Sequence, residues 1–139
     1  MDPGIDLTFD CTDAALMATF WKVALGYEDE PAPAPFSNRD EWMEHHGVPP
    51  EERSGGAWLR DPHGRGPRIA ILAVPEPKTA KNRLHLDLRV AGEGSADQRW
   101  ARITAEVDRL VAAGARPLQF FEGHHVAMAD PEGNEFCVA

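Results

Sequence analysis

Residues 125–138 read HVAMADPEGNEFCV and predict a β-hairpin. Two strand-like segments flank the turn Asp-Pro-Glu-Gly at residues 130–133, and proline followed by glycine is typical of tight turns between strands. A second Asp-Pro-x-Gly turn, at residues 61–64, lies between the strand-like segments 57–60 and 68–74. The sequence therefore predicts one hairpin of this kind in each half of the chain.

A strand and a helix precede each hairpin. In the first half, residues 5–11 alternate apolar and polar side chains, and a helix with its N-cap at Thr12 or Asp13 ends at Gly26. In the second half, residues 83–90 place four aliphatic side chains on one face of a predicted strand, and a helix runs from about Ser95 to Gly114.

The predicted fold class is α+β, with two βαβββ units at about residues 5–75 and 83–139 in a single domain spanning 1–139. The proline-rich residues 31–56 are extra in the first unit, and a short helix is predicted within them at 39–46. A segment of this length fits either a lid over a binding site or a floppy insertion.

The amino-acid composition and net charge limit the classes of partner that the chain is expected to bind. The 139 residues suit one compact domain, and 14 Lys and Arg against 23 Asp and Glu give a net charge of −9. Without a basic stripe the chain is a poor partner for nucleic acid or an anionic membrane. The N-terminus has no apolar leader, so we expect a cytoplasmic protein. Cys11 and Cys137 lie too far apart in the sequence to indicate a disulfide framework or a thiolate zinc site.

The chain resembles the vicinal oxygen chelate superfamily, which includes glyoxalase I, bleomycin-resistance proteins and extradiol dioxygenases, and in particular its bacterial glyoxalase-like proteins. The resemblance rests on Phe20-Trp21 before Leu25-Gly26-Tyr27, on residues 78–88 and on residues 130–137. It implies that the two units form cupped mixed sheets around a cleft that binds a small molecule. It also implies a homodimer.

The resemblance implies metal ligands on the first and last strands of each unit. Two positions fall on His85 and Glu135, a third on Asp6, and the fourth on Leu72, or on Ala70 in another register. The set Asp6, His85 and Glu135 suits a divalent ion assisting a lyase, isomerase or dioxygenase reaction.

A metal-free pocket is the favoured alternative, because neither aliphatic residue at the fourth position can bind a metal. Glu135 would then pair with an arginine such as Arg83 or Arg89. For the same reason glyoxalase I activity itself is not expected.

Candidate catalytic and substrate-binding residues have less specific signals in the sequence than the metal ligands. Glu135 and His125 are the candidate catalytic residues, and His125 suits a general acid or base because imidazole titrates near neutral pH. The favoured alternative for His125 is a histidine at a strand end, half exposed to solvent. Candidate substrate-binding side chains are Trp58, Phe36, Trp42 and Phe121, with ordinary core packing as the alternative. We therefore expect binding of an unspecified small molecule. The bound molecule would then either undergo a metal-dependent reaction or be sequestered as a drug or metabolite, as in bleomycin resistance.

Overall fold

The computed structural model describes residues 1–139 as two compact units. Unit 1 comprises residues 1–22 and 26–77, and unit 2 comprises residues 23–25 and 78–139. Each unit contains a four-stranded sheet with one parallel and two antiparallel strand pairs. The predicted α+β class with two mixed sheets is therefore confirmed.

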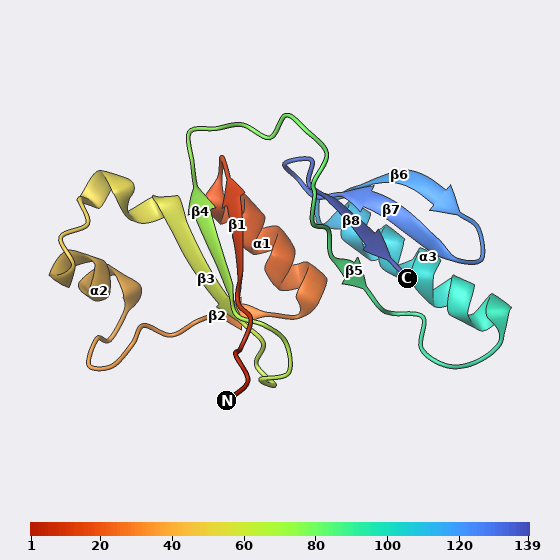
Figure 1. The fold of residues 1–139 in the computed structure, drawn as a ribbon, viewed down its shortest axis with the longest axis horizontal. Helices are drawn as coiled ribbons and strands as arrows, with labels where there is room; N and C mark the ends of the chain where they lie inside the picture. Colours follow the sequence, from red (N-terminus) through yellow and green to blue (C-terminus); the bar gives the residue numbers. More distant parts are fainter. The chain divides into compact units, whose positions relative to one another are not determined.

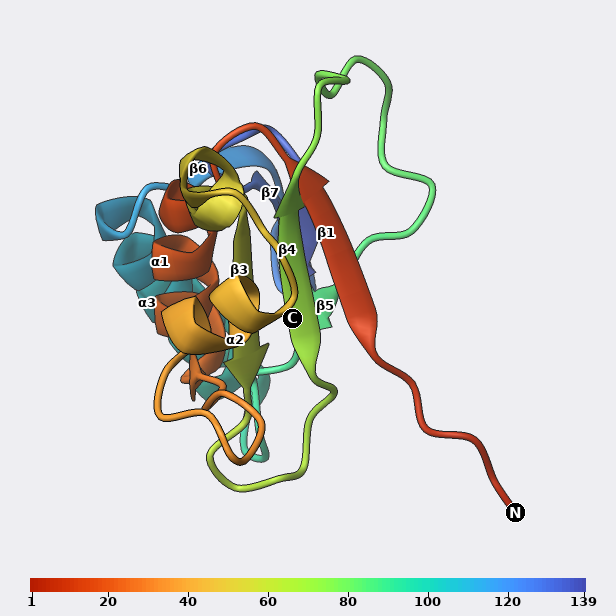
Figure 2. The ribbon, with the colours of Figure 1, turned by 90° about the vertical axis from the view of Figure 1, so that its left-hand side faces the viewer.

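The sheet of unit 1 has the order β1-β4-β3-β2, and β3, β4 and β1 lie side by side in Figure 2. The strands are β1 (Leu7–Cys11), β2 (Glu28–Asp29), β3 (Gly56–Arg60) and β4 (Ile69–Ala73). β3 and β4 form the predicted hairpin, whose turn is closed by the Gly64 N–H donating to the Asp61 carbonyl at 3.0 Å.

Helix α1 (Ala14–Leu25) has the predicted ends. The Asp13 carboxylate accepts a hydrogen bond from the Leu16 N–H at 3.0 Å, and Gly26 adopts a left-handed φ of 68°. The Trp21 ring lies 5.1 Å from that of Phe9 on β1. The core of unit 1 therefore lies on the face of the sheet that carries Phe9, and it includes the fully buried Leu59, Ile69 and Ile71.

The proline-rich insertion packs on the opposite face of the same sheet. Helix α2 (Arg39–His45) forms at the predicted place, and a 3-10 helix, η1 (Pro50–Gly55), follows without having been predicted. Trp42 of α2 lies 6.2 Å, ring to ring, from Trp58, which alternates with the core residues of β3. Helices α1 and α2 accordingly lie on opposite sides of the unit 1 strands in Figure 1.

The sheet of unit 2 has the order β5-β8-β7-β6. Its strands are β5 (Asp87–Leu88), β6 (Arg116–Phe121), β7 (His125–Ala129) and β8 (Glu135–Val138). The strand predicted over 83–90 is reduced to two residues, because its ladder with β8 pairs only Asp87 with Cys137 and Leu88 with Val138. Hydrogen bonds with β8 nevertheless flank it, from the Cys137 N–H to the Leu86 carbonyl and from the Ala139 N–H to the Leu88 carbonyl, each at 2.9 Å.

Helix α3 (Ala96–Ala112) begins with a capping box between Ser95 and Gln98 and contacts β6, β7 and β8 (Figure 1). Its buried side chains face a fully buried row on the sheet: Val126, Met128, Phe136 and Val138. The alternating residues of β7 and β8 therefore point away from α3, and they include His125, Glu135 and Cys137.

Two further features concern the chain as a whole. None of the helices combines the length and apolar character needed to cross a membrane. Cys11 is buried and Cys137 is half-buried, and no disulfide joins them.

Candidate functional site

Unit 1 contains a pocket of about 700 Å³ between the insertion and β3. We call it the Trp58 pocket, and its principal side chains are Glu30, Phe36, Arg39, Met43, Arg53 and Trp58. Two of the four predicted substrate-binding residues, Phe36 and Trp58, line it. Trp42 does not line it but stacks on His46 at 4.2 Å, and Phe121 belongs to unit 2.

Arg39 holds the aromatic wall of the Trp58 pocket in place. Its guanidinium carbon lies 4.3 Å from the Trp58 ring centroid and 5.3 Å from that of Trp42. One of its nitrogens lies 3.4 Å from the Glu30 carboxylate, and the side chains of Arg39 and Glu30 are both more than four-fifths buried. This combination of a cation–π contact and an ion pair fixes the Trp58 indole relative to α2.

Two arginines neutralise Glu30. Arg68 pairs with the second carboxylate oxygen of Glu30. Burial by itself would raise the pKa of this carboxyl, but the hydrogen bonds and positive charges of Arg68 and Arg39 outweigh burial and lower the pKa. Glu30 is therefore ionised near neutral pH and links Arg68, the residue directly before β4, to Arg39 of the insertion.

Arg53 is the cation of the Trp58 pocket without a counter-ion. Its Nε donates to the Val48 carbonyl at 3.1 Å, and the guanidinium makes no ion pair. An anionic group entering the pocket would meet this guanidinium, which suits bidentate contact with a carboxylate. Neither Arg39 nor Arg53 was predictable as a lining residue, because the insertion has no periodicity that separates lining residues from exposed ones.

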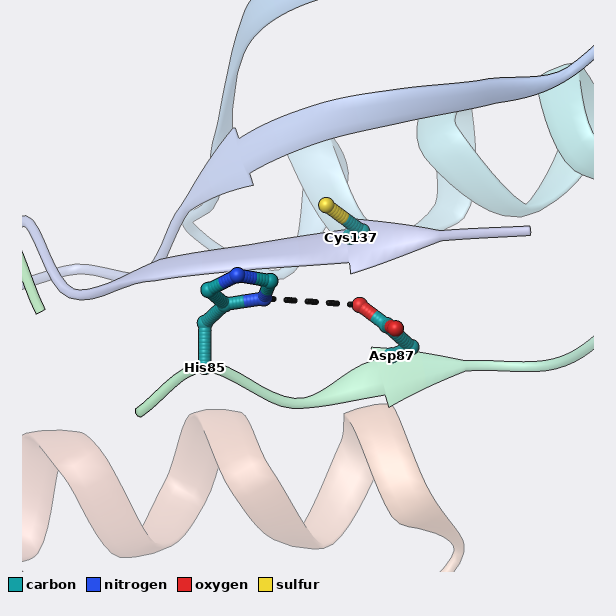
Figure 3. Close-up of side chains that lie close together, drawn as sticks. All are labelled: His85, Asp87 and Cys137. Carbon is teal, nitrogen blue, oxygen red and sulfur yellow. Dashed lines mark ion pairs between the residues drawn. The ribbon is translucent and has the colours of Figure 1, made fainter. Parts of the chain in front are cut away.

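A second group of functional side chains lies in unit 2, on the sheet face opposite α3. Asp87 is the register partner of Cys137, and alternation along the two strands places His85 on the same face as both. Figure 3 shows the three side chains together, with His85 Nδ1 3.5 Å from an oxygen of Asp87. One potential ligand atom from each residue lies within 4.8 Å of the other two. We call these three residues the His85 cluster.

Glu135 lies on the same face as the His85 cluster but has other partners. Its carboxylate accepts a hydrogen bond from the Asn82 backbone N–H at 2.9 Å and lies 3.2 Å from the Lys78 ammonium. The Asn82 hydrogen bond is the principal reason that the pKa of Glu135 falls to about 2, and Lys78 adds to it. The expected pairing with Arg83 or Arg89 is wrong: the connector that precedes β5 supplies a lysine and a backbone amide instead.

The remaining predicted residues are distributed over the two units. Asp6 lies directly before β1 in unit 1. Ala70 and Leu72 lie on β4 of the same unit and are the register partners of Thr8 and Asp10 on β1. His125 begins β7 in unit 2, is half-buried, and stacks on Phe121 with ring centroids 4.4 Å apart.

The donor set beside His85 suits a divalent cation. Within unit 2 the structure adds a carboxylate and a thiol to the imidazole, and these three donor types together hold zinc and similar ions in proteins. Asp87 was visible in the sequence as a polar residue on the face of His85, whereas Cys137 was set aside because it has no cysteine partner nearby in the sequence.

Solved structures share the fold of the whole chain. Fosfomycin resistance protein FosX from Mesorhizobium loti is 12% identical, with 99% of this chain and 91% of that chain covered at a TM-score of 0.63. A glyoxalase-related enzyme from Fulvimarina pelagi is 17% identical, with 100% and 88% covered at a TM-score of 0.61. A mutant FosX from Listeria monocytogenes, complexed with Mn(II) and 1S,2S-dihydroxypropylphosphonic acid, is 12% identical, with 99% and 90% covered at a TM-score of 0.58.

Sequence comparison identifies the family. No curated protein matches the chain. The family model described as the glyoxalase-like domain matches residues 6–139, which is nearly the full length. This chain therefore belongs to the glyoxalase-like domain family.

Proposed function

We propose that the protein binds a small organic anion with a flat apolar part in the Trp58 pocket. The observation that carries this proposal is the unpaired guanidinium of Arg53 in a pocket walled by Trp58 and Phe36. Its volume of about 700 Å³ is within the range of about 300–1,000 Å³ that small-molecule sites occupy.

The charges of the pocket favour an anion over a cation. Glu30 is already paired with two arginines, and Asp29 is paired with Lys22 at 3.0 Å. Asp40, the remaining acidic lining residue, is exposed in the first turn of α2, whereas Arg53 is half-buried. Arg53 is thus the half-buried charged lining group that has no ion-pair partner. Because Arg39 already fixes the indole of Trp58, little ordering of the aromatic wall would be required on binding.

Aromatic carboxylates test this proposal directly. We expect 1-naphthoate and benzoate to raise the melting temperature and to give measurable heats of binding, whereas 1-naphthamide and benzamide have much weaker effects. Arg53→Gln should abolish the preference for the carboxylates, and Trp58→Ala should weaken both classes of probe. Arg65→Gln, which removes an exposed arginine of the same unit without side-chain partners, is the matched control. Equal binding by the wild type and Arg53→Gln, or no binding of any carboxylate, would overturn the proposal.

The second candidate function is a metal-dependent lyase, isomerase or dioxygenase reaction. Two observations favour it: the His85 cluster, and the Mn(II) complex of the structurally similar FosX. A bound divalent ion would supply Lewis-acid polarisation of a substrate oxygen. If the chain holds no ion, the Trp58 pocket alone supports sequestration of its ligand, in the manner of bleomycin resistance.

We also propose that the chain forms a homodimer. Strand β6 is the free edge of the unit 2 sheet, and it exposes Leu118, Phe120 and Phe121. Unpaired apolar edges of this kind favour association with another chain. Light scattering should give twice the chain mass, and Phe120→Glu should shift it toward the monomer. A monomeric wild type at high concentration would refute this proposal.

A further inference from the structure

We propose that His85, Asp87 and Cys137 bind a thiophilic divalent cation, such as Zn²⁺ or Co²⁺, and that Glu135 is not one of its ligands. The proposal deepens the metal-dependent candidate by naming its ligands within unit 2. It concerns ion binding rather than turnover, and it does not depend on the Trp58 pocket.

The backbone fixes the relative positions of the three side chains. The Cys137 N–H donates to the Leu86 carbonyl and the Ala139 N–H to the Leu88 carbonyl, each at 2.9 Å, so hydrogen bonds bracket Asp87. Asp87 and Cys137 are therefore lateral neighbours on parallel strands, and His85 follows two residues away on the same face. Two of the three residues thus lie on paired strands, and His85 lies directly before β5, where the hydrogen bond from the Cys137 N–H to the Leu86 carbonyl holds the chain beside β8.

The distances allow an ion to be enclosed by small side-chain rotations. The three ligand atoms lie within 4.8 Å of one another. Bonds of about 2.0–2.3 Å in a tetrahedral arrangement place ligand atoms roughly 3.3–3.8 Å apart. Contraction of about 1 Å is within reach of χ rotations, because the side chains of His85 and Asp87 are 44% and 60% exposed and are free to adjust.

The donor chemistry selects the kind of ion. Imidazole nitrogen and thiolate sulfur favour zinc and cobalt, whereas magnesium and calcium require oxygen ligands. Three protein ligands leave a fourth tetrahedral position open, as in catalytic zinc sites. The exposure of His85 and Asp87 places this open position toward solvent, where a small molecule could reach it.

The partners of Glu135 exclude it from this set. Its carboxylate already accepts a hydrogen bond from the Asn82 backbone N–H at 2.9 Å and forms an ion pair with the Lys78 ammonium group at 3.2 Å. To ligate an ion, Glu135 would have to release Asn82 and Lys78, and the freed ammonium would then repel the cation. Glu135 therefore holds the connector 78–82 beside β8, and the cation is left to the three neighbouring residues.

Cobalt titration of the chelator-treated full chain tests the assignment. We expect one Co²⁺ per chain, with the near-ultraviolet absorption band that arises from thiolate-to-cobalt charge transfer. Zn²⁺ should remove the band and Mg²⁺ should not. Cys137→Ser should abolish the band, and His85→Ala and Asp87→Asn should each weaken binding by about tenfold or more. Glu135→Gln should retain the band.

Matched controls lie within the same chain. Cys11→Ser, His124→Ala and Asp108→Asn remove the same chemical groups outside the cluster and should leave the titration unchanged. The assignment is overturned if Co²⁺ does not bind, if it binds without the charge-transfer band, or if Glu135→Gln loses the ion while Cys137→Ser keeps it. Binding of 1-naphthoate to the metal-free protein reports separately on the Trp58 pocket, so failure of one proposal is distinguishable from failure of the other.

Discussion

The backbone N–H of Asn82 donates a hydrogen bond of 2.9 Å to the carboxylate of Glu135, 53 positions further along the chain. The ammonium group of Lys78 lies 3.2 Å from the same carboxylate. Together these contacts fasten the connector that precedes β5 to the first residue of β8. They also give Glu135 a structural role at a position where the family resemblance implied a metal ligand.

Loss of the carboxylate charge should loosen this connector. In Glu135→Gln we expect hydrogen exchange of the Asn82 amide to accelerate by about tenfold, because a hydrogen bond to a charged acceptor stabilises by about 1.5–3 kcal/mol and one to a neutral acceptor by about 1 kcal/mol. The Cys137 amide, which donates to Leu86, serves as an internal reference and should keep its protection. Glu122→Gln, at an exposed turn of the same unit, is the control. Unchanged exchange at Asn82 would show that the contact does not hold the connector.

The contact between Arg39 and Trp58 should contribute measurably to stability. We expect Arg39→Lys to lower the free energy of unfolding by about 1 kcal/mol, since a lysine keeps the charge but loses the planar stacking on the indole. A double-mutant cycle with Trp58→Leu should give a coupling of about 0.5–1 kcal/mol, measured by urea denaturation. Arg60→Lys, which alters the exposed pair with Glu28, should change stability by less than about 0.5 kcal/mol. A coupling of zero would mean that Arg39 does not hold the aromatic wall.

The paired carboxylate of Glu30 should make stability depend on pH. Its folded-state pKa lies below the ordinary value of 4.5, so its ionisation contributes stability that is complete above about pH 4.5 and is lost as the pH falls through the lowered pKa. Glu30→Gln should therefore be less stable than the wild type by about 1–2 kcal/mol at about pH 7, and the difference should shrink toward about pH 3. Denaturant melts at both pH values measure this difference. Glu44→Gln, an exposed residue of the insertion, should show no such pH-dependent gap, and a constant gap for Glu30→Gln would contradict the assignment.

Local patterns in the sequence predicted most of the fold. Helix ends and hairpins are encoded by a few neighbouring residues: the caps at Asp13 and Ser95, the glycine at position 26 and the Asp-Pro-x-Gly turns. The helix ends and hairpins were therefore predicted close to their observed positions. The length of the strand over 83–90 was overestimated, because apolar alternation indicates which face of a segment is buried and not over how many residues the backbone pairs with a neighbouring strand. In the structure only Asp87 and Leu88 pair with β8.

The sites were less predictable because their residues meet through pairing between distant segments. Glu135 was expected to pair with an arginine on a strand, yet its partners lie on the connector before the strand, which has no periodicity. Cys137 joins His85 and Asp87 only through the parallel register of β5 and β8, which pairs Asp87 with Cys137, 50 positions further along the chain. Arg53 acquires its place in the Trp58 pocket from a 3-10 helix that no apolar pattern marked.

Gly66 provides a steric test of how tightly the turn after β3 is packed. A Cβ atom built on Gly66 would lie 2.0 Å from the hydroxyl oxygen and 3.1 Å from Cζ of Tyr27, and this hydroxyl donates to the Pro67 carbonyl at 2.9 Å. Gly66→Ala must therefore displace the phenol and break its hydrogen bond, and we expect a loss of about 1–3 kcal/mol in the free energy of unfolding. Gly4→Ala, where a Cβ meets nothing within 4 Å, should be neutral. Adding Tyr27→Phe to Gly66→Ala removes the closest clashing atom and should cost less than the sum of the two single changes. Strict additivity of the two changes would show that the clash with the Tyr27 hydroxyl is not the cause of the destabilisation.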